Sequence, residues 1–156
     1  MIVRSATAGD LGDIAAVHRR SILELCKTDY SAEQLDAWTA ALQAAAYSKL
    51  LSTHELLVAE EDRAVLGFCV LDSTTGFLNA TYVNPPASRR GVGRALVTAA
   101  EAVARTKGLS QIQLNSTLNA VPFYQDLGYA RGELTSNRLP SGVELPCFAM
   151  SKTLMR

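Results

Sequence analysis

The sequence predicts a single domain of the mixed α/β class. Segments that alternate apolar and polar residues, as strands do, lie between segments that repeat apolar residues every three or four positions, as helices do. The 156 residues suit one compact domain, and a hydrophobic share of 48% is enough to build a core. No internal repeat, linker or low-complexity segment divides the chain. We therefore expect the order strand, helices, strands, helix, strand, helix, strands.

The first third of the chain predicts one strand and three helical segments. The strand covers residues 2–6, and residues 7–10 resemble the N-cap of a helix that ends near residue 27. One face of this helix carries mainly apolar residues: Leu11, Ile14, Ala15, His18, Ile22 and Leu25. A capping-box pattern at residues 31–34 opens a second helix, and an alanine-rich stretch around Tyr47 adds further helical turns.

The rest of the chain predicts six strands and two helices. The strands are expected at residues 54–61, 64–72, 77–83, 109–116, 129–138 and 144–152. One helix begins at residue 91 and ends near residue 107, where Gly108 follows as a C-terminal cap. A short helix from about residue 118 to residue 127 ends at Gly128.

Composition and charge argue against several classes of protein. The 15 basic and 15 acidic residues cancel, whereas a general nucleic-acid binder carries a basic excess. No apolar run reaches the roughly 18 residues of a membrane helix, and the N-terminus lacks the apolar segment of a secretory signal. Three cysteines without a C-x-x-C pair favour a cytoplasmic protein without disulfides or zinc. Acidic residues 60–62 predict a solvated turn, so we expect no metal.

The stretch from Tyr82 to Leu96 predicts a site for a phosphate or pyrophosphate. A strand runs into a loop that contains Gly91 and Gly93, and a helix begins there. The N-terminus of a helix offers unpaired N–H donors and the positive end of its dipole, and glycines let a ligand approach the backbone. Three arginines add positive charge to the same stretch: Arg89, Arg90 and Arg94.

Two common phosphate-binding motifs do not fit this loop. A Rossmann fingerprint needs a third glycine where Leu96 stands, and the P-loop pattern is absent. The loop instead resembles the coenzyme A motif of GNAT-type N-acetyltransferases, Q/R-x-x-G-x-G/A. Its six positions are occupied here by Ser88-Arg89-Arg90-Gly91-Val92-Gly93. Ser88 departs from the usual Gln or Arg, which the family's loop tolerates because it binds mainly through backbone N–H groups.

A second stretch strengthens this resemblance. Residues 119–129, NAVPFYQDLGY, resemble a later motif of the same family and follow a predicted strand, as they do there. The resemblance covers about residues 65–130. It implies one N-acetyltransferase domain with a GNAT-like acyl-CoA N-acyltransferase fold: a central twisted mixed sheet with splayed strands, and helices on both faces. Its expected parts are acceptor-region helices (1–53), an acetyl-CoA-binding core (54–130) and C-terminal strands (131–156).

The resemblance implies acetyl-CoA as the acyl donor and assigns residues to its parts. Tyr82 and Val83 would lie nearest the pantetheine arm, in the gap beside a splayed strand. The pyrophosphate would be held by the loop residues: Ser88, Arg89, Arg90, Gly91, Val92, Gly93 and Arg94. Asn119 would form a hydrogen bond with the pantetheine arm, and Tyr124 would lie near the thioester sulfur.

The resemblance also implies direct transfer of the acetyl group to a primary amine of a small molecule or peptide, in a ternary complex. Tyr124 can then donate a proton to the leaving thiolate, although a packed core tyrosine is the alternative. Strand 77–83 has no carboxylate to act as the base. His18 on the first helix is therefore the candidate base, with a structural histidine as the alternative. Three aromatic residues either line the acceptor site or pack the helices: Tyr30, Trp38 and Tyr47.

Two other functions fit the sequence. An acyl-CoA-binding regulatory module would keep the fold without catalysis, and a nucleotide-binding or phosphate-binding domain of another fold would keep only the anion site. The resemblance also makes a homodimer a candidate assembly. Residues 1–72 hold 6 basic and 11 acidic residues, a net charge of −5, and residues 73–156 hold 9 and 4, a net charge of +5. We expect the basic part to attract an anionic cofactor and the acidic part a cationic amine.

Overall fold

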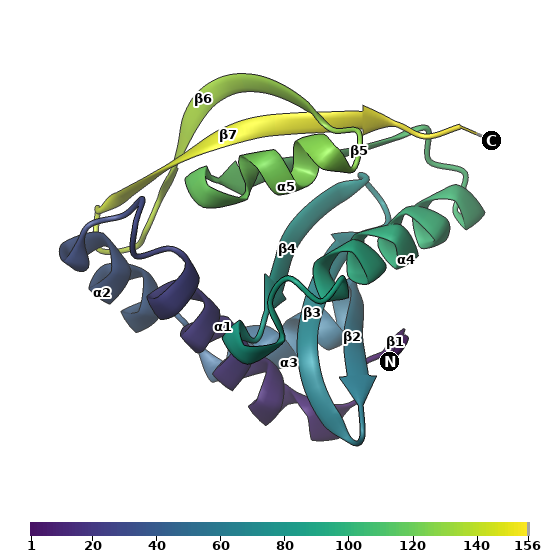
Figure 1. Ribbon diagram of the computed structural model, residues 1–156, viewed down its shortest axis with the longest axis horizontal. Coiled ribbons are helices and arrows are strands. Elements are labelled where there is room, and N and C mark those ends of the chain that lie inside the picture. Colours follow the sequence, from purple (N-terminus) through teal and green to yellow (C-terminus); the bar gives the residue numbers. More distant parts are fainter. Residues whose placement is uncertain (156) are drawn as a thin grey trace.

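A seven-stranded sheet runs through the computed structural model, which describes residues 1–155 (Figure 1). Across the sheet the strands are β1 (Ile2–Ser5), β2 (Glu55–Glu61), β3 (Ala64–Asp72), β4 (Phe77–Val83), β5 (Gln111–Thr117), β7 (Glu144–Thr153) and β6 (Ala130–Arg138). β4 and β5 are parallel, and the other neighbours are antiparallel. Each strand lies close to its expected position, so the predicted mixed α/β class is confirmed.

Five α-helices within residues 1–155 connect the strands: α1 (Leu11–Leu25), α2 (Ala32–Ala40), α3 (Ala44–Thr53), α4 (Val92–Thr106) and α5 (Val121–Asp126). The sequence predicted one continuous helix over residues 118–127, but a 3-10 turn over Leu118–Ala120 precedes α5. Pro122 explains this difference, because it has no N–H to donate to the carbonyl four residues earlier. No helix in the described chain is both long and apolar enough to cross a membrane.

Helices cover both faces of the sheet (Figure 1). α4 and α5 share one hydrophobic cluster with the sheet, in which Leu96 and Ala100 of α4 are fully buried. α1 and α3 pack on the opposite face, in a second cluster around Ile14 and Phe68. A third cluster joins α2 to the end of α1 and to the turn between β6 and β7. Tyr82 contacts both the second and the third cluster, so it lies where these packing units meet.

β4 and β5 separate along most of their length. Phe77 and Leu78 pair with β5, whereas residues 79–83 of β4 have no partner on it. A change of register against β3 leaves Asn79 as an extra residue in β4, and such a bulge bends a strand away from regular pairing. The splayed strands that the resemblance implied are therefore present, and they leave backbone N–H and C=O groups of β4 free in the middle of the sheet.

A buried carboxylate holds α4 in place beside this gap. Glu101 on α4 is 5% exposed, and it accepts a hydrogen bond of 2.9 Å from the hydroxyl of Tyr129. The ammonium group of Lys152 on β7 donates to both carboxylate oxygens at 3.1 Å. A buried charge is tolerated when it is paired and hydrogen-bonded in this way. The network ties α4 to β7 and to Tyr129, three residues after the end of α5, so the two helices that flank the gap keep their spacing.

Candidate active site

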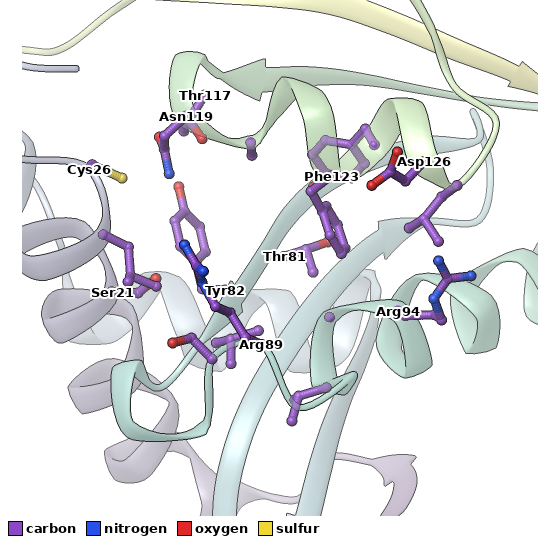
Figure 2. A pocket seen from close by; sticks show the side chains of 18 of the residues that line it. Ser21, Cys26, Thr81, Tyr82, Arg89, Arg94, Thr117, Asn119, Phe123 and Asp126 are labelled. Carbon is purple, nitrogen blue, oxygen red and sulfur yellow. The ribbon is translucent and has the colours of Figure 1, made fainter. Parts of the chain in front are cut away.

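A cavity of about 850 Å³ extends between the splayed part of β4, the start of α4, α5 and the end of α1 (Figure 2). Ten of the twelve predicted site residues line it: Tyr82, Val83, Ser88, Arg89, Gly91, Val92, Gly93, Arg94, Asn119 and Tyr124. Arg90 and His18 are the two that do not line it. The fold thus brings the two sequence motifs, which are about 30 residues apart, to one cavity.

The loop before α4 presents open backbone groups to this cavity. Gly91 is the N-cap of α4, with φ of 82°, and no side chain caps the helix. A Cβ atom on Gly91 would meet no other atom within 4 Å, so there is room for a ligand against the helix N-terminus. Gly93, in contrast, has no room for a side chain, because a Cβ atom there would lie 2.9 Å from the ring of Phe123 on α5. Gly91 therefore leaves room for a ligand, whereas Gly93 allows α4 to lie close to α5.

The three arginines of the loop point in different directions. The Nη2 atom of Arg90 lies 2.7 Å from a carboxylate oxygen of Glu61 on β2, which directs this side chain away from the cavity. Arg94 lines the cavity at the same end as Asp126, whereas the side chain of Arg89 points toward Tyr82 (Figure 2). The charge of Arg90 is therefore neutralised locally, and the charges of Arg89 and Arg94 lie at different ends of the cavity.

Two buried polar atoms in the wall of the cavity lack a partner. The hydroxyl oxygen of Thr81 and the side-chain oxygen of Asn119 are buried without a hydrogen-bond partner among residues 1–155. Leaving such an atom unpaired costs about 1–3 kcal/mol, so it calls for a partner supplied by a ligand or by water. A pantetheine arm carries amide groups of the required kind. The orphaned atoms, the free β4 backbone and the uncapped helix thus fit an acyl-CoA.

Tyr124 supplies a proton donor to the same cavity. The residue is 6% exposed, and its ring packs edge-on against the rings of Phe123 and Tyr129. Burial raises the pKa of the Tyr124 phenol to about 12. The phenol is therefore protonated throughout the physiological pH range, which is the form that a general acid requires.

His18 lies behind the cavity wall. Its Nδ1 atom and the hydroxyl of Tyr47 share a hydrogen bond of 2.8 Å, and its ring centroid lies 4.4 Å from that of Tyr82. Burial lowers the pKa of His18 to about 4, so the imidazole is neutral at physiological pH. Tyr82 lines the cavity and His18 does not, which gives His18 no direct contact with a ligand bound there.

Several cavity residues carried no signal in the sequence. The end of α1 and the residues after it contribute Ser21, Leu25, Cys26, Thr28 and Asp29. Burial raises the pKa of the Cys26 thiol to about 12, so it stays protonated and is a poor nucleophile. Phe123 lies inside the second motif, beside Tyr124, and proximity to that motif was the one clue available. The α1 residues reach the cavity through tertiary packing alone.

Tyr30 was expected either to line the acceptor site or to pack the helices, and its hydrogen bonds favour packing. Its hydroxyl donates to the carbonyl of Pro146 on β7 and accepts a hydrogen bond of 3.1 Å from the N–H of Leu118. It therefore ties the chain after α1 to β7 and to the residue before Asn119. Tyr30, Trp38 and Tyr47 are all buried, and none of them lines the cavity, so packing rather than an acceptor wall describes these aromatic residues.

Comparison with known proteins identifies the family. A family model described as an acetyltransferase (GNAT) domain matches residues 26–153. The chain belongs to this family. The family resemblance inferred from the two motifs, and the GNAT-like fold that it implied, are both confirmed. Among residues 1–155 no three side chains of His, Cys, Asp or Glu gather as metal ligands would.

Solved structures of GNAT acetyltransferases share the fold. A GCN5-related N-acetyltransferase from Rhodopseudomonas palustris is 29% identical, with a TM-score of 0.92 over 98% of this chain and 95% of that one. The PaiA N-acetyltransferase from Thermoplasma acidophilum, in complex with coenzyme A, is 20% identical with a TM-score of 0.76, over 97% and 98% of the two chains. A ribosomal-protein-alanine N-acetyltransferase from Brucella melitensis is 19% identical with a TM-score of 0.73, over 99% and 100%. Comparison with curated proteins gives no match.

Proposed function

We propose that this GNAT protein transfers an acetyl group from acetyl-CoA to a primary amine, directly and within a ternary complex. The proposal rests on the groups that line one cavity. It contains an uncapped helix N-terminus at Gly91, orphaned polar atoms on Thr81 and Asn119, and the protonated phenol of Tyr124. Donor binding and proton transfer need these groups, and here they face the same space.

The donor would lie along the splayed strand. Backbone N–H groups at the start of α4 would hold the pyrophosphate, aided by the charge of Arg94. The pantetheine arm would pair with the free backbone of residues 79–83, because these residues have no β5 partner. Asn119 would accept a hydrogen bond from an amide of the arm, which satisfies its buried oxygen.

The reacting groups follow from this placement. Acetyl-CoA supplies an activated acyl group with a thiolate as its leaving group. Free N–H groups of β4 would stabilise the negative charge that develops on the acyl oxygen. Tyr124 would donate its proton to the thiolate, which leaves as a neutral thiol, and the proton that the amine nitrogen loses as the amide forms would restore the phenol. The buried, protonated thiol of Cys26 favours direct transfer over an acyl-enzyme.

The attacking amine must be neutral. Either a base removes its proton, or the reaction uses the fraction of the amine that is unprotonated in solution. His18 remains the residue that the sequence proposed for this step. Because Tyr82 lines the cavity and His18 packs against it without lining the cavity, such a role would have to run through Tyr82 or through a water molecule. Support of the Tyr82 ring is the second role that the same contacts favour.

Amine-dependent release of CoA thiol is the direct test. The protein is incubated with acetyl-CoA and a panel of amines, and the liberated thiol is measured while calorimetry records the binding of CoA, ATP and NAD. The proposal predicts CoA binding and thiol release with at least one amine. CoA binding without release from any amine would support a regulatory module instead. Tight binding of ATP or NAD without CoA binding would support a nucleotide-binding domain.

Kinetic patterns test the direct transfer. Initial rates measured at several concentrations of both substrates should give intersecting double-reciprocal lines, as a ternary complex requires. Parallel lines, or acetylated protein isolated in the absence of an amine, would contradict direct transfer and would point to an acyl-enzyme.

A further inference from the structure

We propose that the acceptor amine carries a carboxylate, and that the guanidinium group of Arg89 binds it. This inference rests on the proposed N-acetyltransferase function and narrows its acceptor to amino acids and similar amino-carboxylates. It departs from the sequence-based expectation for Arg89, which placed this residue at the pyrophosphate. Three features of the structure support it: the direction of the side chain, the left-handed backbone conformation at this residue, and the charges around the guanidinium.

The direction of Arg89 sets it apart from the other arginines of the loop. Arg94 lies at the end of the cavity that holds Asp126, and the start of α4 lies beside it. The Arg89 side chain instead extends toward Tyr82 and Ser21, at the end bordered by α1 (Figure 2). A pyrophosphate on the α4 N-terminus would therefore be served by Arg94 and backbone N–H groups. Arg89 faces the space left for the acceptor.

The backbone at Arg89 adopts a strained conformation. Its φ of 64° lies in the left-handed region, which costs a residue with a Cβ atom about 1–2 kcal/mol. Within residues 1–155 the other non-glycine residues with positive φ are Asp62 and Arg63, which form the tight turn between β2 and β3. Arg89 lies in the turn between Pro85–Ala87 and α4, and strained residues gather at ligand sites.

The surroundings of Arg89 suit an anion. No carboxylate among residues 1–155 forms an ion pair with Arg89, whereas Glu61 neutralises its neighbour Arg90. Tyr82 and Ser21 border the same end of the cavity. An unpaired guanidinium binds a carboxylate through two parallel hydrogen bonds.

The charges of the cavity agree with this assignment. The carboxylates in its lining are Asp29 and Asp126. Asp126 is at the Arg94 end and Asp29 follows α1, and both are exposed, as Arg89 is. An acceptor with a carboxylate at Arg89 and an amine near Tyr124 would therefore have its anionic end away from Asp126.

The test compares amino acids with their carboxamides. L-amino acids and the corresponding amino-acid amides are assayed for thiol release with wild type, Arg89→Gln and Arg90→Gln. For wild type we expect kcat/KM to be at least about tenfold higher for the best acid than for its amide. Arg89→Gln should abolish this ratio, mainly through KM for the acid, and leave KM for acetyl-CoA unchanged. Arg90→Gln removes the same charge from the same loop and should keep the wild-type ratio.

Other results would overturn the proposal. One such result is a wild-type kcat/KM for the amides that equals or exceeds the kcat/KM for the acids. A rise in KM for acetyl-CoA with Arg89→Gln, at an unchanged acid-to-amide ratio, would assign the guanidinium to the cofactor. Equal loss of the ratio with Arg90→Gln would show an effect of net loop charge.

A binding measurement separates this proposal from the proposed catalysis. N-acetyl amino acids and their amides are titrated by calorimetry into the CoA-bound protein, which needs no turnover. Preference for the N-acetyl acid, lost in Arg89→Gln, supports the carboxylate site even where no amine yields thiol release and the proposed transferase function fails. Equal affinity for the N-acetyl acid and its amide refutes the carboxylate site even where other amines are acetylated.

Discussion

The two ends of the cavity are built in different ways. At the α4 end, the groups that would bind a ligand are backbone N–H donors and two glycines from one short segment of chain, residues 91–94. At the α1 end, side chains from distant parts of the sequence converge: Ser21, Tyr82, Arg89 and Asn119. The first end depends on local conformation, and the second depends on how α1 and the chain after it dock on the sheet.

This difference indicates how such a fold keeps one substrate and varies the other. A binding site formed by backbone N–H groups tolerates most substitutions, because side chains contribute little to it. Such a site suits the invariant phosphates of a cofactor. A binding site formed by side chains, like the α1 end of the cavity, changes with each substitution. The four predictions that follow test the contrast, from the largest expected effect to the smallest.

Tyr124→Phe tests the proposed proton donor in the lining of the cavity. Loss of the phenol proton should lower kcat by about 100-fold or more, because general acid catalysis contributes at that level. The affinity for acetyl-CoA should stay the same, since the ring that packs on Phe123 and Tyr129 is retained. Steady-state kinetics and calorimetry check the two quantities. An unchanged kcat would remove Tyr124 from the mechanism.

Gly93→Ala tests the local construction of the α4 end. The added Cβ atom would lie 2.9 Å from the Phe123 ring, so α5 or this ring must shift. Such overpacking costs about 1–3 kcal/mol, and we expect the Kd for acetyl-CoA to rise about tenfold. Gly12→Ala is the matched control, because a Cβ atom on this α1 residue would meet nothing within 4 Å. Equal Kd values for both variants would show that the close approach of α4 and α5 is not needed.

Tyr30→Phe tests the tertiary construction of the α1 end. The variant keeps the buried ring but leaves the Pro146 carbonyl and the Leu118 N–H without their partner. The free energy of unfolding in urea should fall by about 1–3 kcal/mol. KM for acetyl-CoA should rise as well, because Leu118 precedes Asn119.

Tyr47→Phe is the control for this variant, since its hydroxyl bonds to His18 behind the cavity. It should leave KM for acetyl-CoA unchanged. Loss of stability without any change of KM in Tyr30→Phe would make Tyr30 a purely structural residue.

The pH dependence of stability tests the position of His18. Its pKa is about 4 in the folded protein and close to 6.5 in the unfolded chain, so the unfolded state binds the proton first. Stability should therefore decrease as the pH falls from about 6.5 toward 4, and this decrease should be smaller in His18→Gln.

The same variant tests His18 as the base. A base with a pKa near 4 gives kcat/KM no inflection near pH 6.5. An inflection near pH 6.5 in wild type that is absent from His18→Gln would show that His18 titrates with its ordinary pKa and takes part in the reaction.

The α4 end shows how far a sequence can predict a site. Its glycines act through backbone geometry within a few residues, so their spacing alone indicates an anion site, and Tyr124 follows from a second motif that is equally local. Glu101 is a residue whose position the local sequence does not predict. A glutamate on an amphipathic helix predicts a solvated position, yet here Tyr129 and Lys152 pair with it in the interior. Those partners come from two other segments, and no local pattern brings them together.

The sequence by itself determined the α/β class, the order of the elements, the family and the two motifs, because these depend on periodicity and on spacing within short segments. The tertiary structure alone decided which two of the three arginines line the cavity, that Tyr82 lines it and His18 does not, and that Tyr30 ties the chain after α1 to β7. Each of these facts depends on contacts between residues far apart in the chain. Such contacts form when whole faces of helices and sheet are buried together, and a single position in the sequence does not encode them.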